Sequence, residues 1–263
     1  MSSIQYGKRP LHTPDKIFLI GDVHNEADKL LSVIDQIEAQ LGENDHIVFC
    51  GDLVDRGSQA TLSIETIIAL AKKHPKQVYF VEGNHDYMLR DYLITGSQAW
   101  FTYIEPTLNM WAQDWKLPDI EPETISEALL ARGFQEITSR TIPYYETEEV
   151  IATHAPLDMS IVQMYGGMDY KEDYEDRAND PMFRYLLDRM LSELKWQFTD
   201  ENLIVKEVHK FKVCGHQAGR TTSPRIFKDR AFIDTACGLR PNGRLTCLVY
   251  PGKKYFQSAK ESK

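Results

Sequence analysis

Residues 77 to 86 read QVYFVEGNHD, a short apolar run that ends in a cluster of polar side chains. The same pattern recurs along the chain: KIFLI precedes GDVH, HIVFC precedes GDLVDRG, VIAT precedes HAP, and FKVC precedes GH. Short apolar runs bounded by turn-forming residues are typical of buried strands. We therefore predict five strands, each with polar side chains at its carboxyl end.

Helical patterns separate the first three of these runs. Apolar residues recur at intervals of three and four from Ala27 to Leu41, and a second apolar helix is predicted from Leu62 to Ala71. This alternation of strands and helices predicts an α/β fold in which helices pack on a parallel sheet. Ligands of such sheets lie beyond the carboxyl ends of the strands, which is where the polar clusters fall.

Length and composition are those of an ordinary globular protein. The chain has 263 residues, enough for one large α/β domain, and a formal charge of −9 that argues against general binding to nucleic acid or an anionic membrane. Its N-terminal residues form no apolar signal segment, and no apolar run reaches the roughly 18 residues of a membrane span. We expect a cytoplasmic protein without a membrane partner. Its four cysteines form no CxxC pair and are expected to be buried, reduced thiols.

The polar clusters together contain the side chains that bind divalent metals. Each alone has a simpler explanation, because Gly-Asp is common turn chemistry and a lone histidine usually satisfies a local hydrogen bond. Together the strand ends supply Asp22, His24, Asp52, Asn84, His154 and His216. This mixture of carboxylate, imidazole and amide donors suits manganese, iron or zinc better than calcium, and the number of donors suggests two ions. If Asp52 bridges them, Asp22 and His24 complete one site and the other three residues complete the second.

The motifs GDVH, GDLVDRG and GNHD, followed by the histidines of ATHAP and VCGH, resemble in order and spacing those of the phosphoprotein phosphatase family of calcineurin-like metallophosphoesterases. The resemblance covers about residues 15–250, and the later strands are similar to those of bacterial and phage members, which include serine/threonine phosphatases and dinucleoside tetraphosphatases. It implies a single α/β domain over residues 1–263, with a central β-sandwich flanked by helices and a helical, aromatic-rich segment at about residues 87–140.

The resemblance also implies roles for single residues. The grouping of metal ligands agrees with the one above, and the cofactors implied are two divalent ions, foremost manganese, with iron or zinc as alternatives. His85 matches the general acid that protonates the leaving oxygen, Asp55 the carboxylate that orients the imidazole of His85, and Arg56 a phosphate-binding arginine. A second phosphate-binding arginine is expected before VCGH, with Arg189 as the better match and Arg184 as the alternative.

Some features depart from the family pattern or leave two interpretations open. Asn25 stands where the family usually has glycine, and the stretch IDTACGLRPNGR inserts a proline and Arg240, so the choice of substrate is in question. The segment from Trp100 to Trp115 is either an aromatic surface that stacks a nucleobase or ordinary helical core packing. The run DYKEDYED at residues 169–176 is either a lid or a solvated loop.

The function implied is hydrolysis of phosphate monoesters, foremost phosphoserine or phosphothreonine in proteins, by direct attack of a hydroxide that bridges the two metal ions. One alternative is hydrolysis of dinucleoside polyphosphates, for which the same ligands would serve. An alternative of another class is an inactive module that binds a phosphorylated partner. The expected partners are accordingly a phosphorylated protein or a small phosphate ester; the oligomeric state is not predicted.

Overall fold

The computed structural model describes residues 14–156 and 210–259. The elements of the first part follow in the order β1 (Ile17–Ile20), α1 (Ala27–Glu38), β2 (His46–Phe49), α2 (Ala60–Lys73), β3 (Val78–Val81), α3 (Asn84–Thr95), α4 (Phe101–Trp115), α5 (Pro122–Arg132), α6 (Gln135–Thr138), β4 (Thr141–Ile142), β5 (Tyr145–Glu146) and β6 (Val150–Thr153). Those of the second part are β7 (Phe211–Cys214), β8 (Arg225–Ile226), β9 (Arg230–Phe232), β10 (Thr246–Tyr250) and β11 (Lys254–Gln257).

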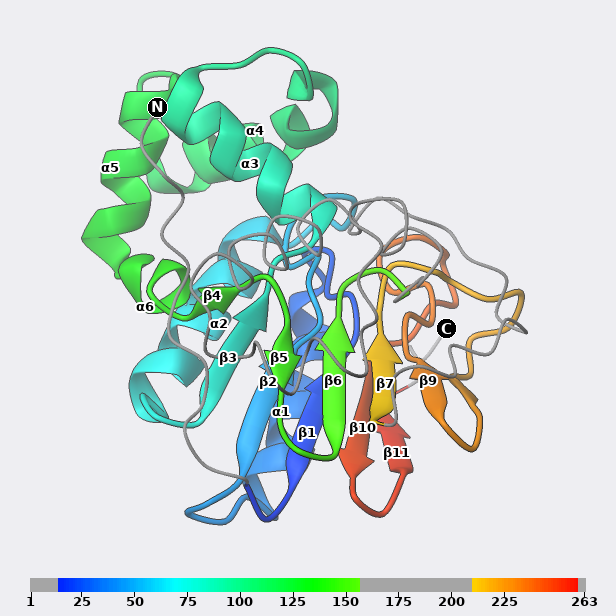
Figure 1. Cartoon of the computed structure of the whole chain (residues 1–263). Coiled ribbons are helices and arrows are strands. Elements are labelled where there is room, and N and C mark those ends of the chain that lie inside the picture. Colours follow the sequence, from blue (N-terminus) through cyan, green and yellow to red (C-terminus); the bar gives the residue numbers. More distant parts are fainter. Residues whose placement is uncertain (1–13, 157–209, 260–263) are drawn as a thin grey trace, which may run out of the picture.

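The strands form two sheets that lie face to face (Figure 1). One has the order β11-β10-β1-β2-β3-β4 and the other the order β5-β6-β7-β9-β8. Strands β1 to β4 run parallel, as the alternation of strands and helices predicts, whereas β10 closes the edge of β1 in the antiparallel direction, with Ile20 beside Cys247. The predicted α/β fold with a β-sandwich flanked by helices is therefore confirmed.

Side chains of the central strands alternate between two apolar cores. Phe18 and Ile20 of β1 pack toward the helices, whereas Ile17 and Leu19 pack between the two sheets. Successive side chains of a strand point to opposite faces, and here both faces are covered. A strand that is buried on both faces needs apolar residues throughout, which explains why these segments are short continuous apolar runs.

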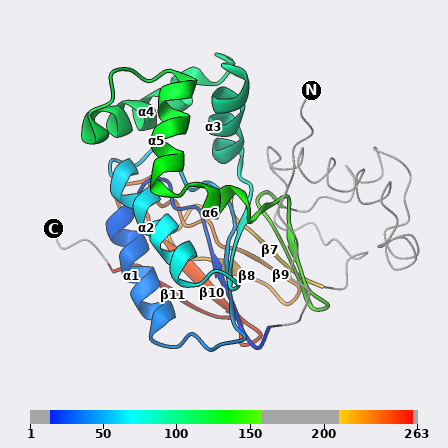
Figure 2. The same ribbon diagram turned by 90° about the vertical axis from the view of Figure 1, so that its left-hand side faces the viewer.

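Helices α1 and α2 cover the outer face of the six-stranded sheet, and the five-stranded sheet lies on its other face (Figure 2). Both helices lie where the sequence predicts them, although α1 ends at Glu38 rather than near Leu41. Helices α3 to α6 form a separate group beyond the carboxyl end of β3 (Figure 1). This helical group therefore lies at the end of the sheet where the polar clusters follow the strands.

The aromatic residues of the helical group serve mainly as core. Trp111 is fully buried and its ring stacks on that of Trp115, with centroids 5.5 Å apart, while the guanidinium of Arg132 covers Trp115. Trp100 and Phe101 also pack against the core. Core packing, not a nucleobase surface, is thus the correct interpretation of these tryptophans.

The structure also bears on the predictions about cysteines and membrane spans. All four cysteines are free and buried, as expected. Among the described residues, no helix combines the length and apolar character needed to cross a membrane. Arg184, Arg189 and the acidic run at residues 169–176 lie outside the described residues, so their expected roles stay predictions.

Candidate active site

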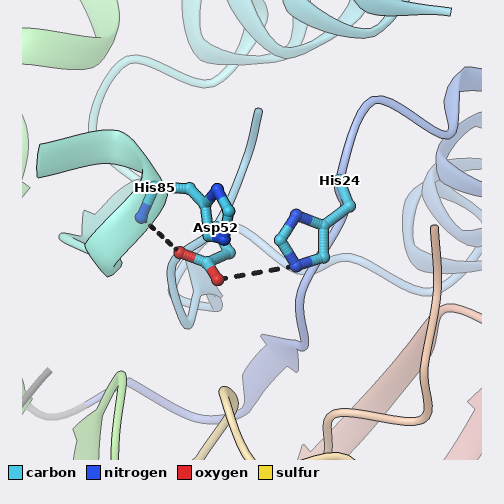
Figure 3. Close-up of side chains that lie close together, drawn as sticks. All are labelled: His24, Asp52 and His85. Atoms are coloured by element: carbon cyan, nitrogen blue, oxygen red, sulfur yellow. Dashed lines mark hydrogen bonds and ion pairs between the residues drawn. The ribbon is translucent and has the colours of Figure 1, made fainter. Parts of the chain in front are cut away.

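Turns that follow neighbouring strands bring the predicted residues together. His24 lies in the turn after β1, Asp52 in the turn after β2, and His85 in the first turn of α3 after β3. Figure 3 shows the carboxylate of Asp52 between the other two residues: its Oδ1 accepts a hydrogen bond from the backbone N–H of His85 at 3.0 Å, and its Oδ2 lies 3.5 Å from Nε2 of His24. Residues far apart in the sequence thus converge at the carboxyl end of the parallel strands.

The backbone at these turns is unusual, because several non-glycine residues adopt positive φ angles. The site residues that do so are His24, Asn25, Asp52, Asp55, Arg56 and His216. Left-handed backbone is disfavoured for residues with a Cβ atom and tends to concentrate at functional sites. Six of the nine non-glycine residues with positive φ in the described part of the chain lie in these polar clusters, which marks this edge of the sheets as the candidate site independently of any motif.

A glycine makes the close approach of these turns possible. Gly51 has a φ of +94° and precedes Asp52. A Cβ atom on Gly51 would lie 2.8 Å from the Cα of Gly83 and still closer to Nδ1 of His154. Only glycine fits both the conformation and the space, so the turns after β2 and β3 can pack against each other.

Two histidines are oriented by hydrogen bonds to backbone carbonyls. Nδ1 of His24 donates to the carbonyl of Val54 at 2.9 Å, and Nδ1 of His154 donates to the carbonyl of Cys50 at 2.8 Å. Each ring therefore presents an unprotonated Nε2 to the cluster when the imidazole is neutral. Histidines that bind metals are commonly held by the other ring nitrogen in this manner.

Several electron-pair donors crowd around Nε2 of His154. Oδ1 of Asn84 lies at 3.0 Å, Nδ1 of His216 at 3.2 Å and Oδ1 of Asp52 at 3.4 Å. A single N–H could satisfy only one of them, and the neutral ring with its proton on Nδ1 offers none. Such a convergence needs a positive charge among the atoms, which either a second proton on the ring or a bound cation supplies, so this group could hold a cation.

Buried charges at the site lead to the same conclusion. Burial and the nearby carboxylate of Asp234 raise the pKa of Asp22 well above its usual range. Burial would lower the pKa of His154, but the carboxylates of Asp52 and Asp22 outweigh it and raise the pKa to about 10. By contrast, burial lowers the pKa of His24 to about 3. Several carboxylates share a desolvated space there, and divalent cations would relieve their repulsion.

Within the described residues, the side chains close enough to share an ion form two groups. One consists of His24, Asp52 and His85, and the other of Asp52, His154 and His216. Asp52 belongs to both groups, as expected of a bridging ligand. Asp22 contacts the cluster through its carboxylate, which lies 3.9 Å from Nε2 of His24 and accepts a hydrogen bond from the backbone N–H of His216 at 3.0 Å. The donor set therefore fits two divalent ions.

His85 contacts the side chains of Asp55 and Arg56 through its two ring nitrogens. Nδ1 donates to Oδ2 of Asp55 at 2.8 Å, and Nε2 lies 3.2 Å from Nη2 of Arg56, which can donate to it only while Nε2 carries no proton. Burial lowers the pKa of His85, but Asp52 and the hydrogen bond to Asp55 outweigh it and leave the pKa above its ordinary value. An imidazole held by a carboxylate beside a metal cluster is suited to donate a proton.

Three polar residues at the site were not assigned roles there from the sequence. Asp234 follows β9 as the candidate ligands follow their strands, so the same pattern could have identified it. Asp86 accepts a hydrogen bond from the backbone N–H of Gly83 at the start of α3, and its carboxylate also accepts hydrogen bonds from the backbone of Asp52 and Leu53. Thr107 of α4 donates to Asp55 at 2.7 Å, and nothing in the sequence indicates that contact.

Comparison with known proteins agrees with this geometry. A family model described as calcineurin-like phosphoesterase matches residues 15–226. The chain is 29% identical over 160 residues to the asymmetrical bis(5'-nucleosyl)-tetraphosphatase PrpE of Halalkalibacterium halodurans, a match that covers 56% of this chain and 60% of that protein. It is 32% identical over 82 residues to the serine/threonine-protein phosphatase PP2A-like PPG1 of Candida albicans, covering 29% of this chain and 19% of that protein. The matches thus span 60% or less of these relatives' length.

A solved structure supports the fold. A cold-active protein-tyrosine phosphatase of a psychrophilic Shewanella species superposes with a TM-score of 0.59 and 16% sequence identity. The alignment covers 98% of this chain and 85% of that one. At this level of identity the similarity establishes the architecture alone.

Proposed function

The chain belongs to the calcineurin-like phosphoesterase family, and we propose that it hydrolyses phosphate monoesters, foremost phosphoserine or phosphothreonine in proteins. The observation that carries this choice is the buried pair of Asp55 and His85, whose hydrogen bond is 2.8 Å long, beside the metal-binding groups. A serine or threonine alkoxide is a poor leaving group, so its departure depends on a proton donor. A polyphosphate leaves far more easily and has less need of one.

The proposed roles follow from the contacts. The residues that would hold two divalent ions, foremost manganese, are Asp22, His24, Asp52, Asn84, His154 and His216. Such ions supply Lewis-acid stabilisation of phosphoryl oxygens and activation of water. His85 would protonate the leaving oxygen and Asp55 would orient its imidazole. Exposed Arg56 would bind the phosphoryl group, because a guanidinium can grip two of its oxygens at once.

Hydrolysis of dinucleoside polyphosphates is the second candidate, because it is supported by a specific observation. Another bis(5'-nucleosyl)-tetraphosphatase PrpE, from Anoxybacillus flavithermus, aligns with 89% of this chain and 89% of its own length at 26% identity. The match to the serine/threonine phosphatase is much shorter. Both reactions would use the same metal ligands, so kinetics must separate them.

The test compares a phosphoserine peptide, p-nitrophenyl phosphate and diadenosine tetraphosphate in the presence of manganese, for the wild type and His85→Asn. We expect the peptide to be hydrolysed by the wild type. The variant should keep its metal content but lose about 10²-fold or more in kcat on the peptide, the usual contribution of general acid catalysis. Its loss on p-nitrophenyl phosphate, which has a good leaving group, should be much smaller.

Other outcomes would change the assignment. A wild-type rate on diadenosine tetraphosphate that exceeds the peptide rate by orders of magnitude would favour the second candidate. Equal losses of His85→Asn on the peptide and on the aryl phosphate would contradict the role of His85 as proton donor. Inactivity of the wild type toward every ester, despite full metal content, would favour a phosphate-binding module.

A further inference from the structure

A threonine of the helical group reaches the proposed proton donor from the far side of Asp55. Thr107 lies on the buried face of α4 and is fully buried. Its hydroxyl contacts Oδ1 of Asp55 at 2.7 Å, and its oxygen also lies 2.9 Å from Nδ2 of Asn25, which is fully buried in the turn after β1. The hydroxyl thus joins two turns of the sheet edge to a helix outside the sandwich.

The chemistry of the groups fixes the direction of these hydrogen bonds. The carboxylate of Asp55 can only accept, so the hydroxyl of Thr107 must donate to it. The oxygen of that hydroxyl is then left to accept, and the amide of Asn25 must present its NH₂ group. On the other side of Asp55, Oδ2 accepts from Nδ1 of His85. Each oxygen of Asp55 therefore has its own donor, and the carboxylate is held from both sides.

We propose that Thr107, held by Asn25, is a positioning residue that fixes the carboxylate of Asp55 and, through it, the imidazole of His85. Helix α4 thereby sets the orientation of the group that delivers the proton to the leaving oxygen. The inference rests on the proposed role of His85, and it assigns a function to a helix that contributes no ligand to the metal-binding groups.

The polar side chains of Thr107 and Asn25 are not those that the fold alone favours at these positions. The neighbours of Thr107 on the buried face of α4 are apolar, namely Ile104, Leu108 and Trp111. Valine has the same shape as threonine and would avoid the cost of burying a hydroxyl there. Asn25 has a φ of +55°, a conformation that glycine adopts without strain, and its buried Oδ1 has no hydrogen-bond partner. Polar side chains at both positions are explained by the hydrogen-bonded chain that runs from Asn25 through Thr107 to Asp55.

The main test uses Thr107→Val, which removes the hydroxyl and keeps the shape, and Thr107→Ser, which keeps the hydroxyl. Thr102→Val is the matched control, because Thr102 is an exposed residue of the same helix. We expect Thr107→Val to lower kcat on a phosphoserine peptide by about 10-fold or more. This loss is a part of the roughly 10²–10⁴-fold that general acid catalysis contributes as a whole. Its effect on p-nitrophenyl phosphate should be small. Thr107→Ser should restore most of the peptide rate, and the control should match the wild type.

A double-mutant cycle tests the contribution of Asn25. Asn25→Gly keeps the left-handed turn and deletes the amide, so we expect a smaller fall in the peptide rate than for Thr107→Val. The double variant should be no slower than Thr107→Val alone, because both changes act on the same hydrogen-bonded chain. Additive losses would instead mean that Asn25 acts independently of Thr107.

A spectroscopic measurement separates this inference from the proposed function. The Nδ1 proton of His85, assigned by its absence in His85→Asn, should give a protected NMR resonance in the wild type and in Thr107→Ser. In Thr107→Val it should exchange faster or shift. An unchanged resonance in Thr107→Val, or equal losses on the peptide and the aryl phosphate, would overturn the positioning role. If the wild type hydrolyses neither ester, the proposed function fails, and the resonance alone decides whether Thr107 positions the pair.

Discussion

Asp86 connects the turn that supplies the shared metal ligand to the helix that supplies the proposed proton donor. Its Oδ2 accepts from the backbone N–H groups of Gly83 and Asp52, both at 2.9 Å, and its Oδ1 accepts from that of Leu53 at 2.9 Å. Both oxygens act only as acceptors. The carboxylate therefore fixes the turn after β2 against the start of α3.

Asp86→Asn should weaken both the fold and the metal site. An amide can present only one acceptor oxygen, so its NH₂ group would face a backbone N–H. We expect a loss of about 1–3 kcal/mol in the free energy of unfolding, the cost of an unsatisfied buried group. Metal affinity should fall by about 10–100-fold, as for other residues that orient ligands. Urea unfolding and metal titration measure the two effects.

The exposed Asp114 of α4 provides the control for that experiment. Asp114→Asn should change neither the free energy of unfolding nor the metal affinity. Metal binding by Asp86→Asn as tight as that of the control would show that Asp86 does not orient the ligand turn.

The sequence indicates the candidate metal ligands more readily than the residues that support them, for a physical reason. A ligand such as Asp52 or His154 is recognisable because it directly follows an apolar strand. The contact of Asp86 with Gly83 is local, but its contact with Asp52 crosses 34 positions of the chain. The bond between Thr107 and Asp55 crosses 52. Only the packing of α4 on the sheet edge creates the second of these contacts.

At the scale of elements, helix α4 is anchored by Trp111. This residue is fully buried, and Thr107 lies one turn before it on the same buried face. Trp111→Ala should lower the free energy of unfolding by about 3–5 kcal/mol, the usual cost of removing a large buried aromatic side chain. Chemical denaturation of the purified protein measures the effect.

Ile94 of α3 is the comparison residue, because it is 62% exposed. Ile94→Ala should change the free energy of unfolding by no more than about 0.5 kcal/mol, as expected of a surface substitution. If Trp111→Ala costs no more than Ile94→Ala, the helical group does not share the stability of the sandwich.

Periodicity predicts elements but not which side of a helix faces the protein. Five of the strands (β1, β2, β3, β6 and β7) and the helices α1 and α2 follow from the sequence because each carries a regular apolar pattern. In α4, aromatic residues occur on both faces: Trp111 is buried, whereas Tyr103 is 55% exposed and its ring centroid lies 6.3 Å from that of His85. The choice between core and surface depends on where the helix docks, which is a tertiary property.

At the scale of the whole molecule, the site lies where the two sheets meet. Asp22 and Asp52 follow strands of the six-stranded sheet, whereas His154, His216 and Asp234 follow strands of the other. Alternation of strands and helices predicted parallel strands but did not indicate two sheets; the family resemblance did. Sequence patterns are local, whereas the division into sheets depends on which strand edges pair.

Removing divalent ions should destabilise the entire sandwich, because buried carboxylates from both sheets would then repel one another. We expect a lower melting temperature in EDTA than in excess manganese. One bound ion at a free concentration of 100 times its Kd adds about 2.7 kcal/mol to the free energy of unfolding. Differential scanning calorimetry of the same preparation in both buffers measures the shift.

Two controls test the origin of that shift. Calcium should stabilise less than manganese, because it prefers oxygen ligands and the site is rich in imidazole. Asp52→Asn should lose most of the manganese effect, since Asp52 belongs to both metal-binding groups. If manganese raises the melting temperature of Asp52→Asn as much as that of the wild type, Asp52 is not a ligand shared by both ions.

The backbone of His216 donates to Asp22 across 194 positions of the chain, and this span has a consequence for biosynthesis. A nascent chain that ends before β7 already carries five of the six candidate ligands, but it has neither His216 nor strand β10, which covers the open edge of β1. Closing so long a loop is entropically costly before the strands pair. If the candidate residues hold metal ions as proposed, both sites would be complete only late in folding, after translation has passed β10, and the ions would stabilise the finished protein without guiding its first steps.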